Sequence, residues 1–83
     1  MNTLEEVLTI LDKVLNLEGR ALLFREDTAL LGAVPELDSM AVVALIAALE
    51  DWFCLAIDDE DINATTFATV GSLTHFVGTR IAA

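Results

Sequence analysis

The chain has 83 residues, of which 55% are hydrophobic, and its 14 acidic and 4 basic residues give a net charge of −10. This length accommodates one domain, residues 1–83, built around a single core. The negative charge opposes binding to nucleic acid or to an anionic membrane and favours partners with basic surfaces.

The sequence predicts neither a membrane span nor a secretory signal. The longest unbroken apolar run, from Met40 to Leu49, is about half of the roughly 20 residues that a transmembrane helix needs. The N-terminus lacks a basic segment followed by an apolar stretch. The single cysteine, Cys54, permits no internal disulfide and suits a reducing compartment, so we expect a cytoplasmic protein.

A first helix is predicted at about Leu4–Leu17. Apolar residues recur there at steps of three and four, which places them on one helical face: Leu4, Val7, Leu8, Leu11, Val14 and Leu15. Thr3 and Glu6 fit a capping box at its start, and Gly19 fits a stop. From Glu18 to Leu37 the periodicity fades, although the segment stays apolar. We expect a long loop pinned onto the helices, with one helical turn near Thr28–Leu31.

A second helix is predicted to begin at Ser39 and to end at Phe53. Asp38 has the short acceptor side chain favoured at an N-cap, and Pro35 resists continuing the helix backwards. Because each residue turns the helix by about 100°, one side carries apolar residues for the core: Val42, Leu45, Ile46, Leu49 and Phe53.

The opposite side of this helix is also weakly polar. It carries Met40, Ala44, Ala47 and Asp51, with Val43 beside them. A small outward apolar patch of this kind is typical of a contact site. The alternative is that the helix is buried on most of its surface.

An acidic run, Asp58 to Asp61, precedes a short helix predicted near Asp59–Ala64. Asp59, Asp61 and Asn63 match the first three ligand positions of an EF-hand calcium loop. The match fails further on, because Ala64 replaces the glycine of the sharp turn and Val70 replaces the bidentate glutamate. We therefore expect no metal site.

The last predicted helix, about Val70–Ile81, is capped by Thr69. Its inner face is expected to carry Val70, Leu73, Phe76, Val77 and Ile81. The sequence thus predicts an all-α protein, a four-helix bundle with a short third helix and a long loop between helices one and two.

Residue chemistry gives little support for an enzyme. The only histidine, His75, lies midway along the last helix, and no neighbour suggests a triad with Ser39. Asp38 beside Ser39 disfavours an alkoxide. Cys54 has anionic neighbours that disfavour a thiolate, so we expect a small core residue there. No Cys/His pairing and no glycine-rich loop indicates a metal or a nucleotide, and we predict a protein that is not an enzyme.

The triplet Asp38-Ser39-Met40 at a helix start resembles the Asp-Ser-Leu signature of the acyl carrier protein family. The surrounding segments fall in the family's order and extend the resemblance over nearly the whole chain: Leu49-Glu50-Asp51-Trp52-Phe53, the acidic segment Ile57–Ile62, and Thr69-Val70-Gly71-Ser72-Leu73. The resemblance implies that a transferase moves 4′-phosphopantetheine from coenzyme A onto Ser39, with Asp38 helping to bind magnesium in that complex. The positive end of the helix dipole tolerates a phosphate at this place.

The same resemblance implies a carrier function and its partners. The thiol of the arm carries acyl groups as thioesters between enzymes, and the partners are a phosphopantetheinyl transferase and acyl-activating or acyl-transferring enzymes with basic or apolar docking surfaces. The expected docking residues are Met40, Val43, Ala47, Glu50 and Asp51. An interior cavity for the acyl chain is expected to be lined by Leu45, Ile46, Leu49 and Ile62. We expect a monomer.

Two departures from the family pattern bear on the pathway. Ala41 and Ala44 stand where typical fatty-acid carriers have acidic residues. This favours a specialised bacterial carrier over housekeeping fatty acid synthesis, and the run Leu31–Met40 is similar to carriers associated with exosortase and exopolysaccharide systems. A peptidyl or aminoacyl carrier stays open, as does an unmodified acidic helical interaction module in which Asp38 is only a cap.

Overall fold

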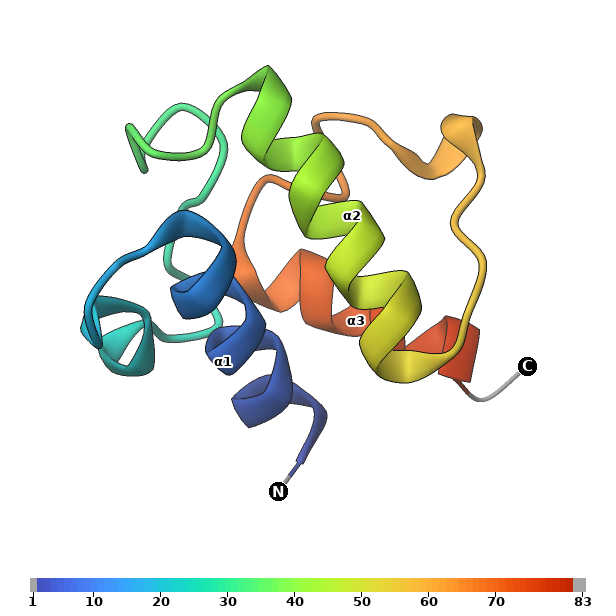
Figure 1. Ribbon diagram of the computed structural model, residues 1–83, viewed down its shortest axis with the longest axis horizontal. Coiled ribbons are helices and arrows are strands. Elements are labelled where there is room, and N and C mark those ends of the chain that lie inside the picture. Colours follow the sequence, from blue (N-terminus) through green and yellow to red (C-terminus); the bar gives the residue numbers. More distant parts are fainter. Residues whose placement is uncertain (1, 82–83) are drawn as a thin grey trace.

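A computed structural model of the protein describes residues 2–81. Three α-helices and two short 3-10 helices follow one another along the chain: α1 (Thr3–Leu15), η1 (Arg20–Leu23), α2 (Ser39–Phe53), η2 (Asp59–Asp61) and α3 (Val70–Ile81). Figure 1 shows the three helices joined by long connections. Within residues 2–81 the only extended pairing is one isolated bridge between Ala29 and Thr69. The predicted all-α fold is confirmed.

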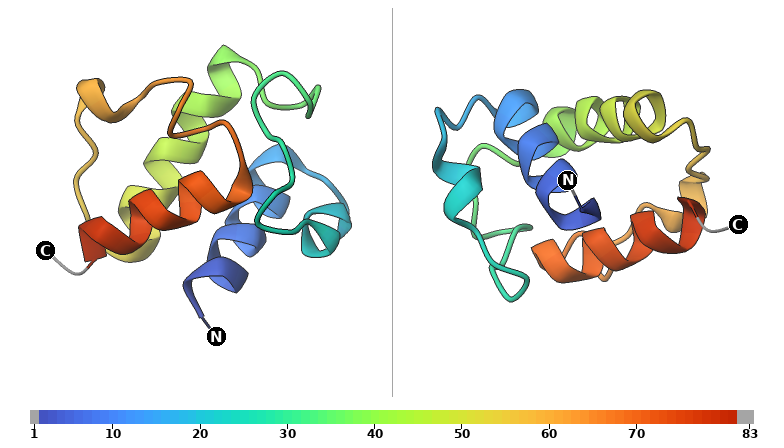
Figure 2. Two further views of the ribbon diagram at one scale, coloured as in Figure 1. Left: turned by 180° about the vertical axis from the view of Figure 1, so that it is seen from behind. Right: turned by 90° about the horizontal axis from the view of Figure 1, so that it is seen from below.

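Helix α1 is the centre of the packing, because it contacts both α2 and α3. Figure 2 shows it between these two helices when the molecule is viewed from below. The apolar faces of all three helices pack together there in one core. Fully buried positions come from each helix and from the loops: Val7, Leu11, Leu45, Leu49, Val70, Leu73, Val77, Leu17 and Leu30. On α3, Phe76 is half-buried as well, whereas Ile81 is 46% exposed, because it is the last helical residue.

Both predicted ends of α1 are shifted. The N-cap is Asn2, whose side-chain oxygen accepts a hydrogen bond from the backbone N–H of Glu5 at 2.8 Å. Thr3 is already helical, so the predicted capping box is wrong. At the other end Asn16 adopts a left-handed conformation, φ 53°, and ends the helix before Gly19. Asparagine tolerates this conformation better than most residues with a side chain.

The long loop between α1 and α2 is fastened to the segment that leads into α3. Four backbone N–H groups donate across this joint: Leu30 to Ala68 O, Leu31 to Phe67 O, Val70 to Thr28 O and Gly71 to Glu26 O, at 2.7–3.1 Å. Residues 28–31 use their backbone groups in this joint and cannot form a helical turn. The turn predicted there is wrong; the loop's helical turn is η1, eight residues earlier.

The third helix of the predicted bundle is reduced to the single 3-10 turn η2. Asn63 ends it, because its side chain donates to Glu60 O at 3.3 Å and accepts from the N–H of Thr66 at 2.9 Å. Such local side-chain bonds compete with helix continuation. The predicted helix near Asp59–Ala64 is therefore shorter than expected, and residues 64–67 form a turn instead.

Helix α3 begins with a reciprocal cap. The Thr69 hydroxyl accepts from the N–H of Ser72, and the Ser72 hydroxyl accepts from the N–H of Thr69, both at 3.0 Å. Two N–H groups at the helix start are satisfied in this way, with serine in the place usually taken by glutamate or glutamine. The predicted cap at Thr69 is confirmed.

Candidate functional site at the start of helix α2

The first turn of α2 exposes a serine at a capped helix start. Asp38 is the N-cap, and its carboxylate accepts a hydrogen bond from the N–H of Ala41 at 2.8 Å. Ser39 is the first helical residue, and both side chains are exposed. The predicted N-cap and the predicted start of α2 are confirmed. The remaining unpaired N–H groups and the dipole make this end of the helix favourable for a negative charge.

The backbone before Asp38 is held from two sides. Leu37 is buried, and its N–H donates to Val34 O at 3.0 Å. Next to it, Glu36 forms an ion pair with Arg20 of η1. The hydrogen bond from the Arg20 side chain lowers the pKa of Glu36 below its ordinary value, so the pair stays charged at a more acidic pH than an isolated glutamate would. Ser39, the first residue of α2, therefore follows a supported loop rather than a free linker.

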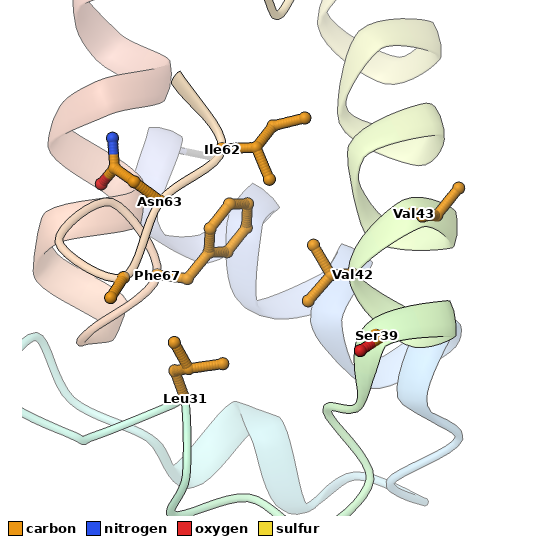
Figure 3. Close-up of a pocket in the computed structure, with 8 residues that line it drawn as sticks. Leu31, Ser39, Val42, Val43, Ile62, Asn63 and Phe67 are labelled. Atoms are coloured by element: carbon orange, nitrogen blue, oxygen red, sulfur yellow. The ribbon is translucent and has the colours of Figure 1, made fainter. Parts of the chain in front are cut away.

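A hollow of about 370 Å³ opens beside Ser39. Its walls come from α2, from the α1–α2 loop and from the segment between α2 and α3, and the lining residues are Leu31, Ser39, Val42, Val43, Ile62, Asn63, Ala64 and Phe67. Figure 3 shows Ser39 at its edge and Phe67 across from Val42. None of these residues carries a charge. The hollow can therefore shelter an apolar group that is attached nearby.

The structure places the four predicted cavity residues in two different environments. Ile62 lines the hollow, but Leu45, Ile46 and Leu49 are not among its lining residues and belong to the buried core. The hollow is lined instead by residues that the sequence interpretation did not assign to a cavity, chiefly Leu31 and Phe67. They come from separate loops, so helical periodicity gave no signal for them.

The two sides of α2 separate as predicted. Met40 is 82% exposed and Val43 is 67% exposed, and Ala44, Ala47 and Asp51 are also exposed. We call the five residues Met40, Val43, Ala44, Ala47 and Asp51 the outward face of α2. Burial of the helix on most of its surface, the alternative left open by the sequence, does not agree with these exposures.

Glu50 differs from the other predicted docking residues because it takes part in the fold. It is half-buried, and its carboxylate accepts a hydrogen bond from the N–H of Ile57 at 2.9 Å. This bond fixes the connection that leaves α2. Any contribution of Glu50 to partner binding has to coexist with this internal bond.

Cys54 is not a core residue, contrary to the prediction. It is exposed and forms the C-cap of α2 with φ 54°. A side chain at the point where the chain leaves the helix turns away from the core. His75 is likewise exposed on α3, far along the chain from Ser39.

In the part of the chain that the structure describes, no group of three or more His, Cys, Asp or Glu side chains could hold a metal ion. Among residues 2–81, no helix has both the length and the apolar character needed to cross a membrane.

Comparison with known proteins gives the family of the chain. The family model described as phosphopantetheine attachment site matches residues 5–77, which include the whole of α2. The chain therefore belongs to the phosphopantetheine-attachment family. No match was found among curated proteins.

A solved structure identifies the kind of carrier. The holo acyl carrier protein from Nitrosomonas europaea, determined by solution NMR, is 48% identical to this chain, each chain is covered over 100% of its length, and the TM-score is 0.92. The chain is an acyl carrier protein of the phosphopantetheine-attachment family, as the sequence resemblance implied. Carriers of this family work with phosphopantetheinyl transferases and acyl-handling enzymes, and they are generally not enzymes themselves.

Proposed function

We propose that Ser39 is the residue that carries the 4′-phosphopantetheine arm, and that Asp38 helps to bind magnesium while the transferase loads it. The observation that carries this proposal is the exposed Ser39 hydroxyl at the capped first position of α2, at the edge of an apolar hollow. The site fits the group. A phosphodiester at this hydroxyl meets the positive end of the helix dipole and can extend into solvent.

The arm, once attached, supplies a thiol that holds acyl groups as thioesters. The chain's own residues then hold the attachment point at a helix tip, offer a docking surface, and shelter the apolar part of the cargo. A tethered arm raises the local concentration of its cargo at a docked enzyme. No side chain that lines the hollow beside Ser39 is a titratable acid or base, which supports a carrier without catalytic activity of its own.

We also propose where partner enzymes dock. The surface consists of Met40, Val43 and Ala47, with Glu50 and Asp51 at the far end of α2. Exposure of Met40 and Val43 beside Ser39 supports this assignment, because exposed apolar side chains next to a reactive position are typical of contact sites.

The pathway is proposed to be a specialised bacterial one. Ala41 and Ala44 follow Ser39 where typical fatty-acid carriers are acidic, so the start of α2 offers a basic partner no carboxylate other than Asp38. A cytoplasmic, single-domain monomer fits the single cysteine and the net charge of −10, which opposes self-association. The uncharged walls of the hollow favour acyl cargo over an aminoacyl group.

The test is loading of the apo protein with coenzyme A by a broad-specificity phosphopantetheinyl transferase. Intact mass should rise by one phosphopantetheinyl group in the wild type and stay unchanged in Ser39→Ala. The alanine variant should keep its helical circular dichroism and change stability by less than ~1 kcal/mol, because alanine is the better helix former.

The chain has one other serine, Ser72, which provides a matched control. Ser72→Ala removes one half of the reciprocal cap of α3, the bond from the N–H of Thr69, but should still accept the arm. A loaded mass in Ser39→Ala, or loss of loading in a folded Ser72→Ala, would reject the assignment to Ser39.

A further inference from the structure

The aromatic ring of Phe67 separates the hollow beside Ser39 from the core. Phe67 is only 2% exposed and belongs to the same buried cluster as Leu45 and Leu49. It is also one of the residues that line the hollow. The ring is therefore packed into the core, and only a small part of its surface reaches the hollow; Figure 3 shows it pointing toward Val42 and Ile62.

The backbone on both sides of Phe67 is fixed. Its carbonyl accepts from the N–H of Leu31 at 3.1 Å, and its own N–H donates to Asn63 O at 3.3 Å. The next carbonyl, that of Ala68, accepts from Leu30 at 2.9 Å. Moving the Phe67 backbone aside would break the joint between the α1–α2 loop and the start of α3. The backbone that carries the ring is therefore fixed, and the nearly complete burial of the ring holds it as the inner wall of the hollow.

The rest of the hollow defines the cargo that suits it. Leu31, Val42, Ile62 and Ala64 supply apolar walls. Asn63 has the one side-chain amide in the lining, and its side-chain oxygen already accepts from the N–H of Thr66 at 2.9 Å. Such walls favour an unsubstituted saturated chain, because a hydroxyl or a charge would lose water without gaining a partner.

We propose that Phe67 is the specificity-determining residue that limits the length of acyl chain the carrier can shelter. A short chain lies in the hollow between Val42 and Ile62. Methylene groups beyond the length that reaches Phe67 stay in water, because the core behind the ring is closed. This inference rests on the proposed attachment at Ser39, which brings the cargo to the edge of the hollow.

The first experiment loads the full chain with saturated acyl groups of increasing length, using acyl coenzyme A donors and the transferase. The thermal midpoint of each acylated form is compared with that of the unacylated holo form. In the wild type the gain should grow with short chains and then stop growing. A gain that rises without limit across the series, or is absent at every length, would overturn the proposal.

Variants at Phe67 test the cause of that limit. In Phe67→Ala the limit should move by about one two-carbon unit or more, because a removed phenyl ring leaves a void that methylene groups can fill. Phe67→Leu, a milder change, keeps the test decisive if the alanine variant does not fold. The control is Leu23→Ala, since Leu23 is 82% exposed and does not line the hollow. An unchanged limit in a folded Phe67 variant would refute the role.

Nuclear Overhauser contacts locate the chain directly. In the wild type, the terminal methyl of a chain at the limiting length should contact the Phe67 ring and the methyl groups of Val42 or Ile62. It should not contact Leu45 or Leu49. Contacts to Leu45 or Leu49 in the wild type would show that the chain passes the ring and would overturn the proposal.

An alkyl chain attached at position 39 without phosphopantetheine tests the role of Phe67 separately from the loading of Ser39. Ser39→Cys in a Cys54→Ser background can be alkylated with thiol-reactive alkyl chains of the same series. If the wild type cannot be loaded but the alkylated variant shows the length limit, the attachment at Ser39 is wrong and the role of Phe67 stands. If loading succeeds and neither series shows a limit, only the role of Phe67 is wrong.

Discussion

At the scale of single residues, Asp38 combines a structural bond with a proposed role in loading. Its carboxylate accepts from the N–H of Ala41 and thereby caps α2, and the same carboxylate is proposed to bind magnesium in the transferase complex. Substitution by alanine removes both functions at once. Asparagine separates them, because its side chain is an equally good N-cap but carries no charge.

We predict that Asp38→Ala lowers the free energy of unfolding by about 1 kcal/mol, the usual cost of a lost N-cap, whereas Asp38→Asn changes it by only a few tenths. Both variants should be loaded more slowly than the wild type, because both lack the charge. Urea unfolding gives the stabilities, and intact mass over time gives the loading rates. Loading of Asp38→Asn at the wild-type rate would limit Asp38 to its capping role.

Sequence reasoning worked best at residues whose environment is local. The cap at Asp38 and the cap at Thr69 follow from side chains acting within three residues of themselves. Prediction from sequence failed where two adjacent residues were equally suited to the same role. Asn2 and Thr3 are both good N-caps, and only the backbone conformation, extended at Asn2, decides between them. At Cys54, the residue type suggested the core, but the left-handed backbone at the helix end places it outside.

At the scale of elements, the joint between the α1–α2 loop and α3 depends on one glycine. The N–H of Gly71 donates to Glu26 O at 2.7 Å, and a Cβ added to Gly71 would lie 2.8 Å from that oxygen. A contact this short cannot be relieved by a side-chain rotation, because Glu26 O belongs to the backbone. The loop has to move away if any side chain is introduced here.

We predict that Gly71→Ala destabilises the protein by about 1–3 kcal/mol, since the clash outweighs the gain in helix propensity. Gly78 in the same helix is the matched control, because no atom other than its chain neighbours and the adjacent helix backbone lies within 4 Å of a Cβ added there. Gly78→Ala should stabilise the protein by about 0.5–1 kcal/mol. Denaturant unfolding of the two variants checks both signs. Equal stabilisation by both substitutions would contradict the close approach of Glu26 O to Gly71.

The elements themselves were predictable to the extent that their signals are local. Apolar residues at helical spacing placed α1, α2 and α3 within a few residues of their bounds. The turn expected at residues 28–31 was wrong because its backbone groups pair with residues 67–70, nearly forty positions away. No sequence pattern within the loop predicts that pairing. The hollow is likewise built by three separate segments. For the same reason, Ile62 is the one lining residue that the sequence predicted to belong to the cavity.

At the scale of the whole molecule, the few positive charges are mostly used internally. Arg20 pairs with Glu36, Arg80 pairs with Asp61, and the Lys13 ammonium lies 5.5 Å from the centre of the Trp52 ring. The net charge of −10 is therefore spread over a surface with few counter-charges. Charge on this scale steers basic partners toward the molecule, but it does not specify where they dock.

The outward face of α2 is the exception on this acidic surface. Its half nearest Ser39 carries Met40, Val43 and Ala44 and no carboxylate, and Asp51 lies at the other end of the helix. Glu50, the remaining nearby acid, is engaged with the N–H of Ile57. Docking beside Ser39 should therefore depend on apolar burial more than on charge. Complete burial of Met40 and Val43 would contribute roughly 1.5–3 kcal/mol each.

We predict that Val43→Asp impairs transfer by a cognate acyl-handling enzyme more than Glu50→Gln does. The glutamine keeps an oxygen that can accept from Ile57, so this variant should remain folded and loses only the charge. Wild-type affinity should fall only modestly as salt rises, because salt screens charge steering and leaves apolar contact in place. The measurement is acylation kinetics of the holo forms, with circular dichroism as the check that each variant is folded.

The reverse change tests the proposed pathway on the same surface. Introducing glutamate at both Ala41 and Ala44 adds the acids that typical fatty-acid carriers have there, and it should improve use by a housekeeping fatty acid synthase while weakening docking to the cognate enzyme. Circular dichroism is needed as a control, because Ala41 is half-buried. If the wild type already serves the synthase as well as a housekeeping carrier does, and the double substitution changes neither rate, the carrier is not specialised and its apolar face does not select its partners.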